Sequence, residues 1–568
     1  MSPRLARRTR PTRRLAPADV RALRQAASRF GGDAAIRKAE LLDRAAACLV
    51  DRPRVLLDYR DALLFLLAYP ETPALYRAAM RALARQDEVA SALPTVALRS
   101  LAGTGVPGST VTGALTLDIA RWLARRHPDA AEIDSFGDAG RPLAGVLALA
   151  LPSLEAELTA SAVDSLALLD EARGRGRSRL AFLVGAIDAI DAAPAVRGLL
   201  YESLVPYLTI RAGGTLTRAS TRGFATTPFC HAAPLERTVA DPRDVIDEPL
   251  PPPRPLSARQ RSALIDAARA TLAVLARETD PVTWPSRNGV TLYELARGAS
   301  IALYPMDTAR RFALDSHTGY LLMKNGVPVA YGGGWPFLAT CRTGINVFPA
   351  FRGGESSWLF AQVLRVYRHH FGVARFVVEP YQFGAGNREG LLSGAFWMYY
   401  RLGFRPVERP LRGVAAAEFE QIRKVSGYRS PLRTMRALAA SDLALDLAPT
   451  DAAMRVDAGA LSLEVSRHVR EAHRGDRKAA AAAAVRHVVA ALGVGDRAGW
   501  PAAEARAFRS LAQVVARVPD LDRWTRDERA ACVALMRAKG AADDAPYFRA
   551  LVAHRRLVEG LLAVLRGH

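Results

Sequence analysis

Apolar residues recur every three or four positions through most of the first 210 residues, which is the spacing of helices that bury one face. The stretches 17–30 and 56–70 show this spacing clearly, and prolines and glycines separate such stretches. The same pattern returns after residue 430 in Ala-rich segments such as 476–493. We therefore predict an all-helical domain over 15–210 and a helical C-terminal region over 431–568.

The pattern changes between residues 318 and 410, where short apolar runs alternate with turn residues. Two of these runs flank Asn325-Gly326, the strongest short-range signal for a β-hairpin. Apolar runs before Pro349 and Pro380 predict two further strands, and a short strand is predicted near 404–410. Between them we expect one helix from about 356 to 371 and another that ends at Gly403. This part of the chain is therefore mixed α/β.

Residues 211–256 lose all periodicity and end in a proline run, "EPLPPPRP". Such a run cannot continue a helix and favours an extended, semi-rigid spacer. Directly after it, Ser257 and Gln260 form a capping-box pattern at the start of a long helix. We expect an α+β multidomain protein with these units: a basic disordered tail (1–14), the helical domain (15–210), a Pro/Gly-rich linker (211–256), a mixed α/β domain (257–430) and the helical C-terminal region (431–568).

The formal net charge of the 568-residue chain is +22, which ordinarily suggests nucleic acid or another anionic partner. Arginine supplies nearly all of the positive charge, and the basic residues are spread along the chain without interleaved aromatics. Together with the abundance of alanine, this is typical of a compositional bias. Only the first 14 residues are densely basic, and we interpret them as a solvated tail in preference to a nucleic-acid arm.

The four cysteines are far apart in the sequence and form no C-x-x-C pair, which disfavours a disulfide framework or a zinc site. A reducing cytosol, and hence a cytoplasmic location, fits this usage. No apolar core of an export signal follows the N-terminal arginines. The most apolar runs fall short of the ~18 residues that a membrane span needs. We expect neither a membrane partner nor a metal.

The stretch from Val347 to Ser357, "VFPAFRGGESS", joins a predicted strand to a predicted helix. Free backbone N–H groups and the positive end of the helix dipole converge at a helix N-terminus. Gly353 and Gly354 would let a ligand approach the backbone closely, and Ser356 and Ser357 could cap the helix or bond a phosphate. The turn is neither a nucleotide P-loop nor a dinucleotide fingerprint. Considered by itself, the turn is better interpreted as an ordinary strand-to-helix bend, because such joints with glycine are common.

The order of elements around this turn resembles the GNAT superfamily of N-acetyltransferases over residues 317–407. "VFPAFRGGESS" is similar to the family's "V-x-P-x-x-R-G-x-G", a turn that holds the pyrophosphate of acetyl-CoA. The resemblance implies that acetyl-CoA is bound by Val347, Arg352, Gly353, Gly354 and by the serines Ser356 and Ser357. Glu355 departs from the family pattern, since a carboxylate beside a diphosphate is repulsive unless it points away.

A second stretch, "FWMYYRLGFRPV", resembles the family's "Y-x-x-L-G-F". The resemblance implies that Tyr399 donates a proton to the departing thiolate of CoA, a role that suits a neutral phenol. From the residues alone, Tyr399 is equally a core tyrosine on an apolar helix face. The family's asparagine corresponds to Asn387, although Asn387 stands twelve residues before Tyr399 and the family's stands seven before it.

Several residues are candidates for the base that deprotonates an amine. Glu379, at the end of a predicted strand, is the first of them, and its alternative is a solvated strand-end carboxylate. His317 is a weaker candidate. His369 and His370 are adjacent on a helix and point about 100° apart, so they cannot chelate one metal as a pair. Cys230 and His231 are neighbours whose side chains diverge in an extended loop.

The function that we expect is acyl-CoA-dependent N-acyl transfer to an amine whose class the sequence does not identify. A non-catalytic scaffold with a degenerate GNAT-like module is the second hypothesis, supported by Glu355 and by the long loop before the last helix. A nucleic-acid-associated protein is the third. The sequence leaves the oligomeric state and the acyl chain length open.

Overall fold

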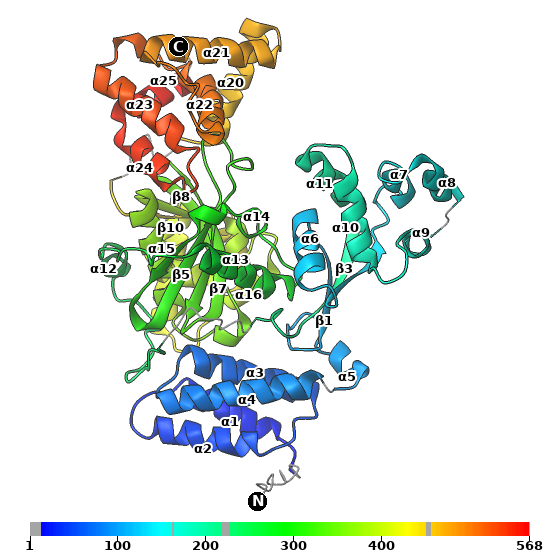
Figure 1. Cartoon of the computed structure of the whole chain (residues 1–568). Helices are drawn as coiled ribbons and strands as arrows, with labels where there is room; N and C mark the ends of the chain where they lie inside the picture. The colour runs from blue at the N-terminus through cyan, green and yellow to red at the C-terminus, as the bar shows by residue number, and fades with distance from the viewer. Residues whose placement is uncertain (1–12, 92, 162–163, 219–226, 450–455, 567–568) are drawn as a thin grey trace, which may run out of the picture.

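The computed structural model describes residues 13–91, 93–161, 164–218, 227–449 and 456–566. One large mixed sheet forms the middle of the molecule, with helical regions at its two ends and a smaller α/β module beside it (Figure 1). The chain is therefore mixed α/β with helical flanks, as expected.

The N-terminal helices form a small bundle beneath the large sheet (Figure 1). They are α1 (Pro17–Ala27), α2 (Ala34–Ala46), α3 (Pro53–Ala68) and α4 (Pro73–Ser91). Helix α3 is the inner one, because residues from 62 to 68 are all buried, including Leu63 and Leu67 at 0% exposure. It packs against α1 and α4 and reaches the large sheet at strand β7 (Val327–Phe337). The apolar side chains of α3 therefore stabilise both the N-terminal bundle and its junction with the large sheet.

The expectation of an all-helical domain over 15–210 is wrong for its second half, which contains a three-stranded antiparallel sheet in the order β1-β3-β2. The strands are β1 (Thr110–Ala114), β2 (Ala131–Phe136) and β3 (Pro206–Arg211). Each is only five or six residues long, so the helical periodicity around it masks its alternation. The helices of this module are α5 (Thr95–Arg99), α6 (Leu117–Arg126), α7 (Leu143–Leu147), α8 (Ser153–Ser161), α9 (Ser165–Ala172), α10 (Arg179–Ala189) and α11 (Pro194–Ser203).

This module has its own apolar core, which also takes in Ala270, Ala273 and Val274 from helix α13 (Ala258–Ala273) and its C-cap. Helix α13 begins at the predicted capping box of Ser257 and Gln260. Its other side packs on the large sheet, so one helix is shared by both cores.

The segment predicted as a spacer is docked on the large unit in its described part. Helix α12 (Pro242–Ile246) packs against α15 (Ser356–Phe371). Just after α12, Asp247 forms an ion pair with Arg368 at 2.7 Å, and the backbone carbonyl of Glu248 accepts a hydrogen bond from Arg365 Nε at 2.9 Å. These contacts fix the proline run against the helix, so the segment does not act as a free spacer. Residues 219–226 lie outside the described residues.

The large sheet has eight strands in the order β10-β11-β9-β8-β7-β6-β5-β4. Asn325-Gly326 forms the predicted hairpin, with both residues at positive φ (48° and 77°). Strands β4, β5 and β11 lie outside the range 318–410 to which the sequence assigned strands. The strands are β4 (Thr291–Glu294), β5 (Ala299–Pro305), β6 (Thr318–Lys324), β7, β8 (Thr340–Val347), β9 (Arg375–Val378), β10 (Arg405–Pro406) and β11 (Leu443–Asp446).

Strands β8 and β9 form the only parallel pair among the described strands of this sheet, and they separate early. Their pairing covers Thr340 to Arg342 against Arg375 to Val377, although β8 continues to Val347. Strand β9 ends at Val378, and Pro380 has no N–H with which to extend the ladder. The second half of β8 is therefore paired on one side only.

Helices cover both faces of the sheet. Helix α15 packs on the face opposite α13 and buries Phe360, Val363, Leu364, Tyr367 and Phe371, as the sequence predicts. The single helix predicted before Gly403 is two helices, because Gly394 adopts φ +71° between them. The remaining helices here are α14 (Asp280–Thr283), α16 (Arg388–Ser393), α17 (Ala395–Arg401), α18 (Arg409–Lys424) and α19 (Leu432–Leu438).

The C-terminal region is helical after β11 and caps the other end of the molecule (Figure 1). It meets the large unit where α24 packs on α15, with His370 Nε2 3.2 Å from Asp543. Its helices are α20 (Ala458–His473), α21 (Arg477–Leu492), α22 (Ala502–Val515), α23 (Arg526–Ala538), α24 (Ala545–Ala553) and α25 (Arg555–Arg566).

Candidate functional site

A cavity of about 560 Å³ lies along the separated part of β8. It brings together six of the residues predicted from sequence, while Gly354, Ser357 and Glu379 are not part of its wall. The six are Val347, Arg352, Gly353, Ser356, Asn387 and Tyr399. The strand, the turn, the helix N-terminus and the tyrosine therefore share one space.

The turn that enters α15 presents backbone to this cavity. Gly353 adopts φ +88°, and no described atom lies within 4 Å of the place where its Cβ would stand. Ser356 is the first residue of α15, so its amide and those of the next two residues have no acceptor four residues earlier in the helix. Open space beside a glycine and free helix-terminal amides together suit an anion.

Glu355 does not oppose an anion here, because its carboxylate is buried on the far side of the turn. It forms an ion pair with Lys324 at 2.8 Å and a second one with Arg297. Burial raises the pKa of Glu355, but Lys324 and Arg297 outweigh burial and hold the pKa below its ordinary value. The departure from the family pattern is thus a structural group that points away from the cavity.

The backbone at Gly354 lies close to another part of the protein and not to open space. A Cβ at this position would stand 2.8 Å from the hydroxyl of Tyr69, which follows helix α3. The side of Gly354 on which a Cβ would stand is thus occupied by Tyr69, and Gly354 does not line the cavity. Gly353 is the glycine that faces open space.

Tyr399 lies at the inner end of the cavity with 1% of its surface exposed. Its hydroxyl oxygen accepts a hydrogen bond from the amide of Ile345, in the separated part of β8. Burial raises the pKa of the phenol well above its ordinary value, so it stays protonated at neutral pH. The ring packs edge-on against Phe360, with 5.4 Å between centroids. Tyr399 is therefore both a core residue and a protonated group at the cavity.

The amide of Val347 points into the same gap. Amide directions alternate along a strand, and the next amide, that of Phe348, donates to the carbonyl of Val329 on β7 at 3.0 Å. The amides of Ile345 and Val347 consequently face the side on which β9 has left the sheet. The amide of Ile345 donates to the hydroxyl of Tyr399. The amide of Val347 is directed at the cavity.

Asn387 and Arg352 line the cavity but are engaged by other groups. Asn387 is the N-cap of α16, where its Oδ1 accepts the amide of Gly390 at 3.0 Å and its Nδ2 donates to the carbonyl of Tyr381 at 3.0 Å. Arg352 forms an ion pair with Glu389 at 2.6 Å. The structure thus gives Asn387 a capping role. The guanidinium of Arg352 would bind a ligand only by contacting it together with Glu389 or by giving up the ion pair with Glu389.

Glu379 is not at the cavity, because its side chain is 60% exposed and lies 3.9 Å from Arg342. The sequence patterns did not identify Asp61 of α3, a carboxylate that lines the cavity from the N-terminal bundle. Burial raises the pKa of Asp61, while Arg218 at 3.3 Å opposes that effect. No local signal marks Asp61, since it sits in an ordinary helix nearly 300 residues before the turn.

The remaining candidates lie elsewhere. His317 stacks on Trp335 at 3.8 Å between ring centroids and is buried away from the cavity. His369 and His370 have separate partners, the carbonyl of Ile246 and the carboxylate of Asp543. His231 packs among aromatic rings, apart from the Cys230 thiol. In the part of the chain that the structure describes, no group of three or more His, Cys, Asp or Glu side chains could hold a metal ion.

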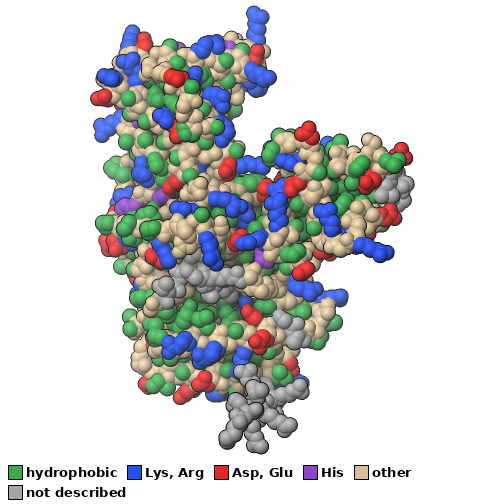
Figure 2. Space-filling model, viewed as in Figure 1, with side chains coloured by type: hydrophobic (Ala, Val, Ile, Leu, Met, Phe, Trp, Pro, Cys, Tyr) green, Lys and Arg blue, Asp and Glu red, His purple; other side chains and the backbone are tan. Residues whose placement is uncertain are grey.

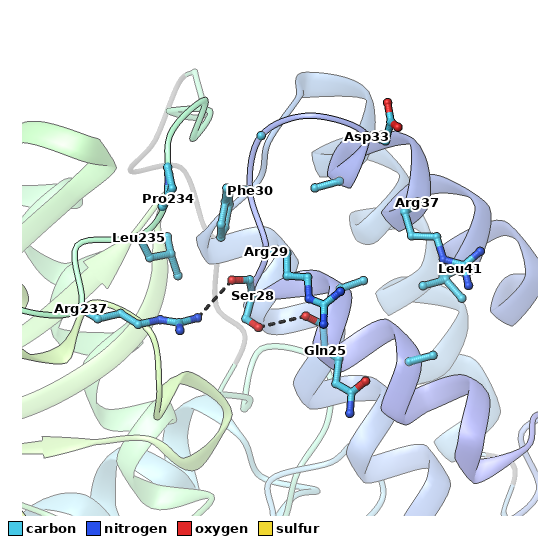
Figure 3. A pocket seen from close by; sticks show the side chains of 14 residues that line it. Gln25, Ser28, Arg29, Phe30, Asp33, Arg37, Leu41, Pro234, Leu235 and Arg237 are labelled. Atoms are coloured by element: carbon cyan, nitrogen blue, oxygen red, sulfur yellow. Dashed lines mark hydrogen bonds between the residues drawn. The ribbon is translucent and has the colours of Figure 1, made fainter. Parts of the chain in front are cut away.

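A second cavity, of about 830 Å³, lies between α1, α2 and residues 234–237 (Figure 3). Arg237 spans it and donates to the carbonyl of Ser28 at 3.1 Å, while Arg37 pairs with Glu40 at 3.3 Å. Arg237 and Arg37 thus bond to neighbouring protein atoms instead of converging on a common point. The smaller cavity along β8 has the better-defined chemistry.

Comparison of the chain with protein-family models, with curated proteins and with solved structures gives no match. In addition, no helix in the described ranges is both long and apolar enough to cross a membrane.

Proposed function

We propose that this protein is an acyl-CoA-dependent N-acyltransferase, with acetyl-CoA as the donor and an amine as the acceptor. The observation that carries the proposal is the early separation of β8 from β9, which opens a cavity between the N-terminus of α15 and Tyr399. This arrangement agrees with the GNAT resemblance of the two sequence stretches. The diphosphate, the thioester and the leaving sulfur of the acyl donor would each meet a suitable protein group along this cavity.

Backbone amides at Gly353 and Ser356 would bind the diphosphate, and the helix dipole would favour its charge. The amide of Val347 would donate to the thioester carbonyl and stabilise the oxyanion that forms on attack. The acceptor nitrogen then forms a bond to the acyl carbon, and the bond from that carbon to sulfur breaks. Tyr399 would donate the proton that the thiolate takes up.

The amine has to lose a proton, and the protein offers two carboxylates for this step. Glu379, the candidate from sequence, lies outside the cavity wall, so it would need a chain of waters. Asp61 lines the cavity, and burial raises its pKa towards the range of a general base. We favour Asp61 as the base and as the group that attracts an ammonium.

The alternative of a non-catalytic scaffold has its own support. The side chain of Asn387 caps a helix and Arg352 is paired with Glu389, so both side chains already have partners within the protein. A nucleic-acid role has less support, because Lys and Arg side chains are scattered over every part of the visible face and do not gather into one patch (Figure 2).

Calorimetric titration of the full-length protein with acetyl-CoA tests the proposal. Gly353→Glu places a carboxylate in the cavity, and we expect it to abolish binding. Gly475→Glu is the matched control, since Gly475 also has a positive φ (83°) and open space beside it but lies in the C-terminal region. Strain and charge are then equal in the two variants, and only the position differs.

Saturable binding that Gly353→Glu loses and Gly475→Glu keeps would place the donor at the turn. A folded wild-type protein that does not bind acetyl-CoA or a longer acyl-CoA would refute the acyltransferase proposal. A search for protein partners of a scaffold would then follow.

A further inference from the structure

The turn that faces the cavity is backed by a cluster of three charged residues: Lys324, Glu355 and Arg297. Lys324 and Glu355 are both 0% exposed, and Nζ lies 2.8 Å from Oε2. Arg297 approaches the other carboxylate oxygen with Nε at 2.9 Å. Burial lowers the pKa of Lys324 to about 8, against the raising effect of Glu355. The group is therefore a charged cluster inside the protein at neutral pH.

Three separate parts of the chain meet at the carboxylate of Glu355, and a fourth meets the backbone amide of the same residue. Lys324 ends strand β6, and Arg297 lies in the connection between β4 and β5 with a positive φ of 57°. The amide of Glu236, from the segment before α12, donates to Glu355 Oε1 at 3.1 Å. The hydroxyl oxygen of Tyr69, in the N-terminal region, accepts a hydrogen bond from the amide of Glu355 at 3.5 Å. The position of Glu355 is thus determined by contacts remote in sequence.

Glu355 stands at the junction between the turn and the helix. It is the N-cap residue of α15, yet its side chain makes no capping bond to the helix. Instead the carboxylate points back to the sheet, which anchors the backbone immediately after Gly353 and Gly354. Gly353 lies at φ +88° inside a turn that the amide of Gly354 closes by donating to the carbonyl of Phe351 at 3.0 Å. Its conformation therefore depends on the anchored residues on either side.

We infer that the Lys324–Glu355–Arg297 cluster is a positioning device that holds the turn at Gly353 in the shape that receives the diphosphate of the acyl donor. The inference rests on the proposed function, because it concerns the same binding turn. Through Tyr69 and Glu236, the N-terminal bundle and the docked segment contribute to this device. These regions are thereby part of the donor site, although they do not contact the donor at this point.

The protein contains a second buried Lys–Glu pair that serves as a control. Lys38 Nζ lies 2.8 Å from Glu71 Oε2, and the two side chains are 0% and 7% exposed. Glu71 also accepts a backbone amide, that of Gly31 at 2.8 Å. The pair resembles Lys324–Glu355 in burial, distance and hydrogen bonding, but it lies within the N-terminal bundle and makes no contact with the turn.

The experiment compares Glu355→Gln with Glu71→Gln in the full chain, by acetyl-CoA calorimetry and by the thermal unfolding midpoint. Each variant leaves one buried lysine without its carboxylate, so both midpoints should fall. We expect Glu355→Gln to weaken acetyl-CoA binding at least about tenfold, because a tenth or less of the molecules would then hold the competent turn. For Glu71→Gln, the affinity for acetyl-CoA should stay within about twofold of the wild-type value, because the fraction of molecules with the competent turn does not change.

Tyr69→Phe provides a second variant that keeps every charge and removes one hydroxyl. It should weaken binding in the same direction as Glu355→Gln, by a smaller factor. Unchanged affinity in both Glu355→Gln and Tyr69→Phe would overturn the inference while leaving the proposed function intact. Equal weakening by Glu355→Gln and Glu71→Gln would also overturn it, since the effect would then be general destabilisation. Absence of binding to the wild-type protein would instead refute the proposed function.

Discussion

The two sheets of this protein are built from similar short strands, yet the interior strands β3 and β8 differ in how completely their neighbours pair with them. In the small module, β3 is paired with β1 over residues 207–211 and with β2 over residues 206–210. In the large sheet, β8 is paired with β7 throughout but with β9 only from Thr340 to Arg342. The cavity lies at the unpaired part.

The cavity is therefore lined by a strand whose hydrogen-bond ladder is incomplete on one side. A complete ladder satisfies every amide and leaves nothing for a ligand. Where β9 turns away at Pro380, two amides of β8 are released, and one of them is taken by Tyr399. The other is available to a carbonyl from outside. Variants in the two sheets can test this contrast.

Glycines in the two sheets should differ most in their tolerance of a side chain. A Cβ on Gly334 of β7 would stand 2.4 Å from the buried ring of Tyr367, whereas one on Gly113 of the edge strand β1 would meet only Ala276, at 2.6 Å. We expect Gly334→Ala to lower the free energy of unfolding by about 3 kcal/mol and Gly113→Ala by about 1 kcal/mol. Urea denaturation measures both, and equal losses would contradict the contrast.

Acid should destabilise the large sheet through His317. Burial lowers the pKa of His317 to about 3, so the folded state binds this proton only at low pH while the unfolded state binds it near 6.5. Between these values the unfolded state carries more protons, so stability falls as pH falls, by up to about 1.4 kcal/mol per pH unit. His317→Phe should flatten the dependence of the unfolding midpoint on pH between 6.5 and 3. An unchanged slope would argue against a neutral buried histidine.

Removing the hydroxyl of Tyr399 should separate its two roles. Tyr399→Phe keeps the aromatic packing but leaves the amide of Ile345 without its acceptor, which we expect to cost about 1 kcal/mol of unfolding free energy. Acetyl-CoA should still bind, because the diphosphate groups are untouched, while the rate of transfer to an acceptor should fall about 10²-fold. Loss of folding would indicate a purely structural tyrosine, and full activity would exclude the proton-donor role.

The smallest effect is expected on the exposed face of the small sheet. The hydroxyls of Thr112 and Thr209 lie 2.8 Å apart across β1 and β3. Thr112→Val should lower the free energy of unfolding by only about 0.2–1 kcal/mol, as expected for one cross-strand pair. Its acetyl-CoA affinity should equal that of the wild-type protein. A change in affinity would show that the small module is coupled to the cavity.

The sequence predicted the strand–turn–helix at 340–371 and the hairpin at Asn325-Gly326 because their signals are local. Asn-Gly favours positive φ at both positions, and the apolar spacing of α15 defines its buried face. The capping role of Asn387 also has a local signal, an asparagine three residues before the amide that it caps.

Local sequence signals are therefore sufficient to predict which elements form around the turn and where Tyr399 stands on its helix. The separation of β9 from β8, the direction of Glu355 towards Lys324 and the approach of Asp61 to the cavity depend on tertiary packing. Each of these depends on residues far apart in the chain, and Asp61 and Glu355 are nearly 300 residues apart. Propensity and periodicity act over a few residues, whereas the direction of a buried charge is set by whichever partner the fold brings within hydrogen-bonding distance.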